Sequence, residues 1–414
     1  MPGLDCITKK YFENNLNQYI DCIYANIHNK IYKFTPYKEK LVIKSKNKTR
    51  QISLPTIKDK LVLGVLKEVL LEIYDEINYK LVQVTIYELA NKIRLYDGFI
   101  KIDISDFYGS IDHNLLMGIL HKKIRKDNIR KLIKDSIENP TLSRGYSKKS
   151  IGLNKCGVPQ GIPISNILAS IYLKNLDQIY LEKDNIAYFR YVDDILILCN
   201  YSELSTIKEE ITLELKDKYL LEINKNKLKS GIVDDGFEYL GYNINKSDIR
   251  VRDISLKNFE KSLQSTFEEY QHLGRKNINL FIWDLNLKIT GCINEKNKYG
   301  WLFFFSQIND EFVLYHLDWL IKKYIKRYNI IIPDNSKFKI KRFVRTYNEI
   351  IKNLHNTQYI PNFDKYTLNE MKNFLKEIHG MAIDGWEEEL IKDKFKHIVY
   401  KKSRKLEKDI QSFS

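Results

Sequence analysis

The chain has 414 residues, enough for two or three domains that each bury a core. Its 43% hydrophobic and 12% aromatic residues exclude a disordered protein, and its net charge of +15 favours a polyanionic partner. An AT-rich genome, which enriches Lys, Ile, Asn and Tyr, is a second source of that charge.

No apolar run approaches the length of a membrane span, and the N-terminus lacks a signal-peptide pattern. The five cysteines are scattered and show neither a disulfide framework nor zinc-ligand spacing. We therefore expect a cytoplasmic protein without a membrane partner.

The N-terminal segment, to about residue 40, predicts polar helices. A basic turn over 44–50 then leads into a strand that ends at Pro55, which indicates a hairpin with cations at its tip. An amphipathic helix is expected from residue 57 to about 74. The cations form either a solvated face or an arm that grips phosphate, and the sequence leaves both readings open.

A strand is predicted over 99–104. Its isoleucines at 100, 102 and 104 share one face, so Asp103 falls on the other face, away from the core. A turn follows, and a helix begins at about residue 111. An Asp at a strand end is usually a turn or cap residue, so a metal site at Asp103 requires a second acidic strand.

Residues 114–150 predict a basic helical insertion, in which 121–126 could contact a nucleic-acid backbone. The Gly- and Pro-rich stretch 157–165 is a turn, and Ser165 is the expected N-cap of the next helix. Free N–H groups at that helix start favour phosphate, although ordinary Gly-Pro turns would also explain the glycines. The expected core face of this helix is Leu168, Ile171, Tyr172, Leu176 and Ile179.

The pair Asp193-Asp194 lies between two runs of strand-forming residues, 189–192 and 195–198, and predicts the tip of a tight hairpin. Adjacent carboxylates repel each other, and a divalent cation would relieve that repulsion. A solvated Asp-Asp loop is the commoner case, so the metal reading depends on Asp103.

The ordered set Asp103-Ile-Ser-Asp-Phe-Tyr108, Gly157-Val-Pro-Gln-Gly-Ile-Pro-Ile-Ser165 and Tyr191-Val-Asp-Asp194 resembles palm motifs A, B and C of reverse transcriptases. Residues 221–227 resemble motif D, 237–242 the primer-grip motif E, and 50–62 the fingers motifs of the same family. The resemblance covers roughly residues 44–245.

The resemblance implies an RNA-directed DNA polymerase that uses two Mg²⁺ ions, with Mn²⁺ as a substitute. Asp103 and Asp193 would bridge the metals, with the backbone carbonyl of Ile104 as a further ligand. Neighbouring strand residues point to opposite faces, so Asp194 takes a second-metal or primer-side role. Lys227 matches the motif D lysine that protonates the leaving pyrophosphate, and its alternative is a surface lysine.

The same resemblance implies the nucleotide contacts. Tyr108, five residues after Asp103, stands where reverse transcriptases place an aromatic residue that collides with a ribose 2′-hydroxyl. RNA-dependent RNA polymerases usually place a second Asp there, and Asp106 is two residues too early for that role. The sequence therefore favours dNTPs over rNTPs. The remaining expected contacts are Phe107, Gln160 and Gly161 for the nucleotide, Arg50 with Lys58 or Lys60 for its triphosphate, and Phe237, Leu240 and Gly241 for the primer.

Beyond residue 242 the family signal fades. Helices are expected over 255–275, 314–328 and 343–354, the last two with basic outer faces, and a basic helix over 392–405. The aromatic run 299–306 is either helical core, which we favour, or a base-stacking platform.

We expect an α+β right-hand polymerase with an antiparallel palm sheet. The predicted domains are N-terminal helices and fingers at 1–95, palm at 96–245 with a fingers insertion at about 114–150, and a helical thumb and C-terminal domain at 246–414.

No maturase, HNH nuclease, zinc knuckle or RNase H pattern is visible. Asn166 stands where retron and intron enzymes usually have Pro, which disfavours both groups. The layout resembles bacterial defence-associated reverse transcriptases, and 289–301 resembles the smaller polymerase of their two-polymerase type. Expected partners are dNTPs, a noncoding RNA template, the DNA product, and a second reverse transcriptase subunit or another copy of this chain. The alternatives are a retron-type or intron-derived enzyme and a non-catalytic nucleic-acid-binding protein.

Overall fold

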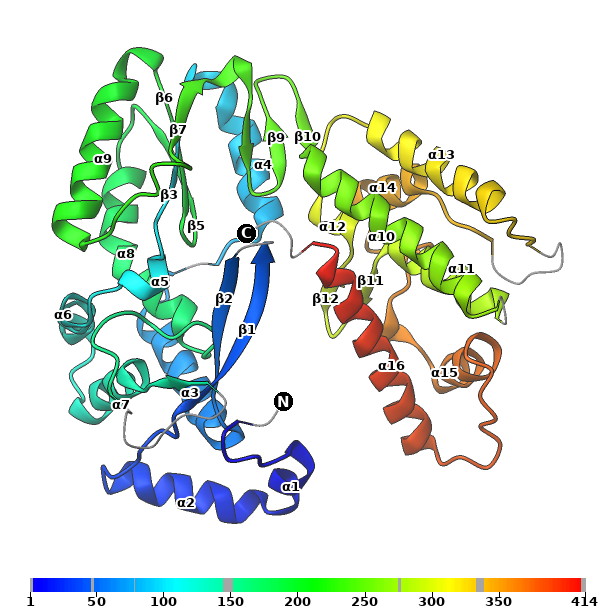
Figure 1. Cartoon of the computed structure of the whole chain (residues 1–414), viewed down its shortest axis with the longest axis horizontal. Coiled ribbons are helices and arrows are strands. Elements are labelled where there is room, and N and C mark those ends of the chain that lie inside the picture. The colour runs from blue at the N-terminus through cyan, green and yellow to red at the C-terminus, as the bar shows by residue number, and fades with distance from the viewer. Residues whose placement is uncertain are drawn as a thin grey trace. The chain divides into compact units, whose positions relative to one another are not determined.

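The computed structural model of the chain describes residues 3–45, 48–77, 79–143, 152–274, 277–332 and 339–410. The chain divides into two compact units (Figure 1). Unit 1 comprises Met1–Lys80 and Lys92–Val233, and unit 2 comprises Leu81–Asn91 and Asp234–Ser414. The division into fingers, palm and thumb stays a prediction. No helix among the described residues is long and apolar enough to cross a membrane.

Unit 1 alternates helices with short strands. Its helices are α1 (Lys9–Asn14), α2 (Leu16–His28), α3 (Ile57–Ile73), α5 (Phe107–Ser110), α6 (His113–Lys123), α7 (Asp127–Glu138), α8 (Ser165–Leu181) and α9 (Leu204–Tyr219), with 3-10 turns η1 (Ile93–Leu95) and η3 (Tyr201–Glu203). Its strands are β1 (Tyr37–Ser45), β2 (Lys48–Leu54), β3 (Gly98–Asp103), β4 (Thr141–Leu142), β5 (Ala187–Tyr191), β6 (Asp194–Cys199) and β7 (Lys229–Ile232).

The central sheet of unit 1 is antiparallel, with strand order β5-β6-β3-β7. Ile100 and Ile102 of β3 lie in one core cluster with Ile195 and Ile197 of β6 and with buried residues of α8 and α9. These two helices cover one face of the sheet (Figure 1). The predicted alternation in β3 and the predicted acidic hairpin β5–β6 are confirmed.

The predicted hairpin is also confirmed, because β1 pairs with β2 in antiparallel register and Arg50 lies opposite Val42; its predicted basic tip, 46–47, lies outside the described residues. Strand β4 adds to β1 in parallel. The predicted insertion contains α6 and α7, and its residues 144–150 lie outside the described part of the chain. Its basic run is partly neutralised, since Lys123 pairs with Glu76 at 2.7 Å.

Two predictions about α8 are wrong. Ser165 is the first helical residue and not the N-cap, and its Oγ donates to the carbonyls of Pro159 (2.7 Å) and Ile162 (2.9 Å). The hydroxyl therefore holds the preceding loop closed. Ile179, expected on the core face, is 40% exposed, whereas the other four predicted residues are buried.

Unit 2 is mainly helical. Its helices are α4 (Val82–Lys92, whose last residue falls in unit 1), α10 (Asp253–His272), α11 (Ile278–Thr290), α12 (Trp301–Phe304), α13 (Phe312–Arg327), α14 (Phe343–Lys352), α15 (Leu368–Asn373) and α16 (Glu388–Lys408). Shorter turns are η4 (Val233–Asp235, whose first residue falls in unit 1), η5 (Phe363–Lys365) and the π-turn η6 (Phe374–Ile378). Its strands are β8 (Phe237–Tyr239), β9 (Tyr242–Ile244), β10 (Ile249–Val251), β11 (Cys292–Asn294) and β12 (Asn297–Tyr299).

The aromatic run 299–306 belongs to the core, as favoured from the sequence. Trp301 is 1% exposed and stacks on Phe259 of α10, with ring centroids 4.4 Å apart. Phe305 is fully buried beside Trp301. These rings fix α12 against α10 and do not form an open base-stacking platform.

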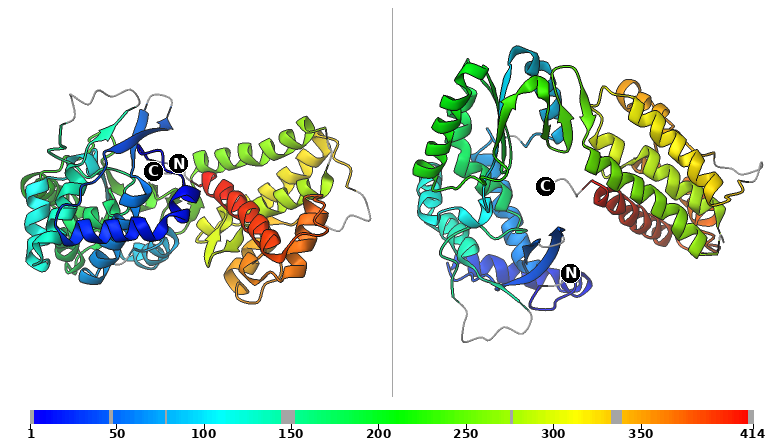
Figure 2. Two further views of the ribbon diagram at one scale, coloured as in Figure 1. Left: turned by 90° about the horizontal axis from the view of Figure 1, so that it is seen from below. Right: turned by 45° about the horizontal axis from the view of Figure 1, so that its top comes forward.

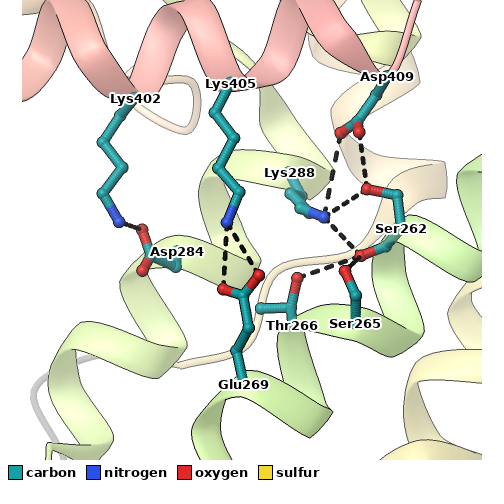
Figure 3. A network of polar contacts seen from close by, with 9 residues as sticks. All are labelled: Ser262, Ser265, Thr266, Glu269, Asp284, Lys288, Lys402, Lys405 and Asp409. Carbon is teal, nitrogen blue, oxygen red and sulfur yellow. Dashed lines mark hydrogen bonds and ion pairs between the residues drawn. The ribbon is translucent and has the colours of Figure 1, made fainter.

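The basic tail helix α16 packs against α15, β11 and β12, and its side chains reach α10 and α11 (Figures 2 and 3). Lys405 pairs with Glu269, and Lys402 pairs with Asp284. Near the end of α16, Asp409 accepts a hydrogen bond from Ser262 at 2.7 Å, and the buried Lys288 ammonium also binds Ser262 (Figure 3). Part of the positive charge of this helix is therefore paired with carboxylates within unit 2.

Candidate active site

The acidic residues lie at the ends of the two central strands of the unit 1 sheet. Asp103 ends β3 and Asp194 begins β6, and the two are directly opposite in the antiparallel register. Side chains of opposed residues share one face, so Asp194, rather than Asp193, is the cross-strand neighbour of Asp103. The Ile104 N–H donates to the Asp193 carbonyl at 3.2 Å, which ties the hairpin turn to the end of β3.

The turn itself is conformationally costly. Tyr191 and Asp194 form the last pair of the hairpin, so Val192 and Asp193 make a two-residue turn. Val192 has φ of +58°, a left-handed conformation that is unfavourable for a β-branched residue. Surrounding contacts must hold such a residue in place, and these residues gather at functional sites.

Arg190 and Asp177 supply that support, and the sequence interpretation missed both. Arg190 on β5 makes a two-pronged ion pair with Asp177 on α8, with Nε donating at 2.6 Å, and its Nη1 donates to the Val192 carbonyl at 2.9 Å. Tyr188 also donates to Asp177 at 2.9 Å. A charged residue between the strand-forming aromatic residues Phe189 and Tyr191 was the available signal.

A lysine covers Asp103. The Lys227 Nζ lies 2.6 Å from the Asp103 Oδ1, and the Asn224 side chain donates to Oδ2 at 3.5 Å. The Asp103 side chain is therefore only 11% exposed, although the sequence predicted that it points away from the core. The local strand pattern could not predict this cover, because it comes from the segment before β7.

The carboxylates affect one another electrostatically. Burial raises the pKa of Asp194 to about 6; the Lys101 ammonium opposes the rise, and the charges of Asp193 and Asp103 add to it. Three acidic groups thus lie close enough to disfavour full ionisation, which is the situation that a bound cation relieves.

The donor types at this site, though not their present arrangement, suit a hard divalent cation. No group of three or more His, Cys, Asp or Glu side chains converges as a metal site in the described part of the chain. The ammonium of Lys227 instead neutralises Asp103. Carboxylate oxygens of Asp103, Asp193 and Asp194 are nevertheless the ligand type that Mg²⁺ prefers.

Tyr108 lies near these acids. Burial raises the pKa of its hydroxyl to about 12, with a further rise from the Asp193 charge and an opposing effect from the Arg50 guanidinium. The hydroxyl donates to the Asn166 Oδ1 at 2.8 Å. The structure therefore brings Tyr108, Asp193 and Arg50 into one neighbourhood, and it adds Asn166 as the partner of the tyrosine.

The loop at 157–164 joins this neighbourhood to the β1–β2 hairpin. The Val158 N–H donates to the Tyr108 carbonyl, and the Ser53 N–H of β2 donates to the Gln160 carbonyl, both at 2.7 Å. Gly161 has φ of +100°, and a Cβ there would lie 2.6 Å from Ile52 Cγ2. Close packing on β2 therefore requires glycine at this position.

The other predicted nucleotide contacts have different surroundings. Phe107 is 2% exposed and belongs to the core, so it packs beneath Tyr108 and is not open to a nucleotide. The Lys58 ammonium lies 5.2 Å from the centre of the Tyr32 ring, and Lys60 is exposed. Of the three candidate cations, Arg50 is the one with an electrostatic effect on Tyr108.

The predicted primer-grip residues belong to unit 2. Phe237 lies on β8, and the turn to β9 contains Leu240 and Gly241, both with positive φ. Phe237 and Leu240 are buried, at 5% and 8% exposure. The structure forms a β8–β9 hairpin here, and its role in primer binding stays a prediction.

An antiparallel sheet backed by two helices, with acids at the ends of its central strands and a Gly-rich loop beside them, is the arrangement that the sequence predicted for a polymerase palm. In keeping with this class, residues 38–244, half of the chain, match the family described as reverse transcriptase (RNA-dependent DNA polymerase). The chain therefore belongs to the reverse transcriptase family, and the predicted α+β polymerase fold is confirmed.

Individual relatives are distant. Protein YkfC of Escherichia coli K12 is 22% identical over 291 residues, which cover 59% of this chain and 75% of YkfC. The group II intron-encoded protein LtrA of Lactococcus lactis subsp. cremoris is 28% identical over 148 residues, 34% of this chain. The chain aligns with only 24% of LtrA and with 20% of an uncharacterized 91 kDa protein in a cob intron of Schizosaccharomyces pombe.

Among solved structures, telomerase from Candida albicans in complex with a fragment of telomeric RNA matches 95% of this chain and 66% of its own, with 13% identity and a TM-score of 0.47. Apo telomerase from Candida tropicalis matches 88% of this chain and 69% of its own, with 15% identity and a TM-score of 0.45. Both structural similarities are low.

Proposed function

We propose that this protein extends a primer with dNTPs on an RNA template, and that Asp103, Asp193 and Asp194 form its catalytic centre. The observation that carries the proposal is the opposition of Asp103 and Asp194 across β3 and β6, with Asp193 in the adjoining turn. The family match supports RNA as the template and DNA as the product.

The three carboxylates and the Ile104 carbonyl would hold two Mg²⁺ ions, for which Mn²⁺ can substitute. When bound, the ions supply activation of the primer 3′-hydroxyl and stabilisation of the pyrophosphate. Lys227, 2.6 Å from Asp103, is the proposed acid that protonates the leaving pyrophosphate.

The nucleotide would bind beside the loop that carries Gln160 and Gly161, which packs on β2 of the β1–β2 hairpin. Arg50 is the proposed triphosphate contact, because its charge reaches Tyr108 beside the acids. Tyr108 is the proposed sugar gate, since its ring would exclude a ribose 2′-hydroxyl. Phe237, Leu240 and Gly241 are proposed to grip the primer.

The test is primer extension by purified protein on an RNA template with Mg²⁺. We expect dNTP incorporation, no rNTP incorporation, and loss of synthesis in Asp193→Asn and Asp194→Asn chains that melt like the wild type. Tyr108→Ala should admit rNTPs. A wild-type preference for rNTPs would overturn the sugar-gate assignment, and activity in the doubly substituted chain would overturn the catalytic centre.

We further propose a cytoplasmic role in bacterial anti-phage defence with a noncoding RNA template and, as a further partner, a second reverse transcriptase subunit. The resemblance of residues 289–301 to the smaller polymerase of the two-polymerase defence type supports this reading. Similarity to LtrA instead favours an intron-derived enzyme, whereas Asn166 in place of Pro disfavours it. Sequencing the RNA and DNA that co-purify with the chain separates the two, because an intron enzyme would retain its own intron RNA.

A non-catalytic nucleic-acid-binding role is the remaining alternative. Phage challenge of cells that carry the wild type or an Asp193→Ala, Asp194→Ala chain addresses it. Protection that survives the double substitution would favour this alternative over synthesis.

A further inference from the structure

Helix α13 of unit 2 carries three large aromatic side chains on its outer side. Phe312 is 84% exposed, Tyr315 is 54% exposed and Trp319 is 52% exposed. They are spaced by three and four residues, so they form one stripe along the helix, here called the aromatic stripe. The opposite side of α13, including Leu314, is buried in unit 2.

Such a stripe is not explained by the packing of unit 2. Many other rings of unit 2 are buried and pack against one another, as Trp301 does on Phe259. Single exposed apolar residues are normal, but an aligned group of aromatic residues marks an interaction surface. The sequence predicted only a basic outer face for this helix, so the aromatic stripe is a finding of the structure.

The same side of the helix is positively charged. Lys322, Lys323 and Lys326 are exposed and make no ion pair with any described residue. The Lys323 ammonium lies 4.8 Å from the centre of the Trp319 ring, a cation–π contact. Cations therefore continue the stripe for about 10 Å beyond Trp319, at 1.5 Å per residue.

Two acidic groups beside α13 are ion-paired. Asp310, two residues before α13, pairs with Arg250 at 3.0 Å, and Asp318 pairs with Arg342. Glu260 of α10 is hydrogen-bonded to His316 at 2.7 Å, and the exposed Glu311 lies directly before Phe312. Toward the other end of the helix, the aromatic stripe adjoins the three exposed lysines.

We propose that the aromatic stripe and its lysines bind single-stranded RNA. Bases would stack on Phe312, Tyr315 and Trp319, and phosphates would lie along the lysines. An apolar protein partner would use the rings but leave the lysines unpaired, so the charge favours a polyanion. The choice of RNA rests on the proposed function, because the template is the single strand that a reverse transcriptase meets.

The experiment uses the full chain with Asp193→Asn and Asp194→Asn, without dNTPs, so that binding is measured apart from synthesis. The probes are an oligouridine of about 12 nucleotides and an abasic phosphodiester of the same length. Trp319, at 52% exposure, is the most exposed of the chain's four tryptophans, so its fluorescence reports stacking directly.

We expect oligouridine to quench the fluorescence and the abasic strand to bind without quenching. Trp319→Phe should remove the quenching, and Tyr315→Ala should weaken RNA binding roughly tenfold, the effect of one lost stacking contact. Tyr87→Ala is the matched control, because Tyr87 is also a helical tyrosine of unit 2 and is 58% exposed. Its affinity should equal that of the parent.

Equal quenching by the abasic strand, or equal affinity of the Tyr315→Ala and Tyr87→Ala chains, would overturn the proposal. So would a change of oligomeric state in Phe312→Ala at unchanged RNA affinity, which would make the stripe an interface between copies. If the wild-type chain incorporates no dNTPs, the proposed function is wrong, but the fluorescence result on base stacking would still hold.

Discussion

The hydrogen bond from Tyr108 to Asn166 predicts how sharply this enzyme tells dNTPs from rNTPs. The Tyr108 hydroxyl donates to the Asn166 Oδ1 at 2.8 Å, which holds the ring from the first turn of α8. If the ring is the sugar gate, a ring that can tilt should exclude the 2′-hydroxyl less well. Tyr108→Phe removes the hydrogen bond and keeps the ring, whereas Asn166→Ala removes the acceptor.

One hydrogen bond at a partly exposed site is worth about 0.5–1.5 kcal/mol. At about 1.4 kcal/mol per tenfold change, each substitution should lower the dNTP-to-rNTP ratio of kcat/KM by roughly 2- to 12-fold. The double variant should lose no more than either single variant, because both remove the same bond. Tyr108→Ala removes the ring itself and should lose more.

The assay is single-nucleotide primer extension with dNTP and rNTP in parallel, and Tyr201→Phe, a remote exposed tyrosine of unit 1, is the control. Unchanged discrimination in Tyr108→Phe would refute the reasoning. Additive losses in the double variant would show that Asn166 acts on the nucleotide by another route.

Four further outcomes are expected. Asp103→Asn should reduce primer extension by roughly 10³-fold while the melting curve changes little, since it removes charge stabilisation at the reacting centre. Asp177→Asn should lower the free energy of unfolding in urea by about 2–4 kcal/mol, because Arg190 is only 10% exposed and loses its ionic partner. A loss below about 1 kcal/mol would contradict a structural role for this ion pair. Gly161→Ala should lower the free energy of unfolding by about 1–3 kcal/mol, since alanine is strained at φ of +100° and its Cβ would collide with Ile52 of β2. An unchanged midpoint of urea unfolding would count against that packing. Burial, and then the charge of a neighbouring arginine, lower the pKa of Lys341 from 10.5 to about 8. Between these two pH values the unfolded chain binds more protons than the folded chain, so the free energy of unfolding should rise as the pH increases from about 8. Lys341→Met should flatten that rise, as measured by urea titrations at several pH values.

Local sequence patterns determined much of the fold. The isoleucine alternation placed β3, and the run of strand formers around Asp193-Asp194 placed the β5–β6 hairpin. Both predictions depend only on residues that are close together in the sequence, so the local residue pattern was sufficient to make them. The ordered motifs then identified the family, which the family match confirms.

Contacts between distant segments were not available from those patterns. The register that sets Asp194 opposite Asp103 belongs to the pairing of β3 with β6, two strands far apart in the chain, and the lysine on Asp103 comes from a segment 124 residues later. The sequence ranked Asp193 above Asp194 because it treated the pair as strand neighbours. The folded sheet instead pairs Asp194 with Asp103, and the position of Asp193 in the turn is set by the Arg190 contact to Val192.

Side-chain environments also required the tertiary structure. Ser165 had the residue type and position of an N-cap, but the loop before it folds back so that its hydroxyl binds two loop carbonyls. Phe107 had the position of a nucleotide contact, yet burial of its apolar surface places it in the core. The sequence therefore determined which residues could do the chemistry, and only the packing of separate elements decided which of them meet, because burial and charge pairing depend on residues far apart in the chain.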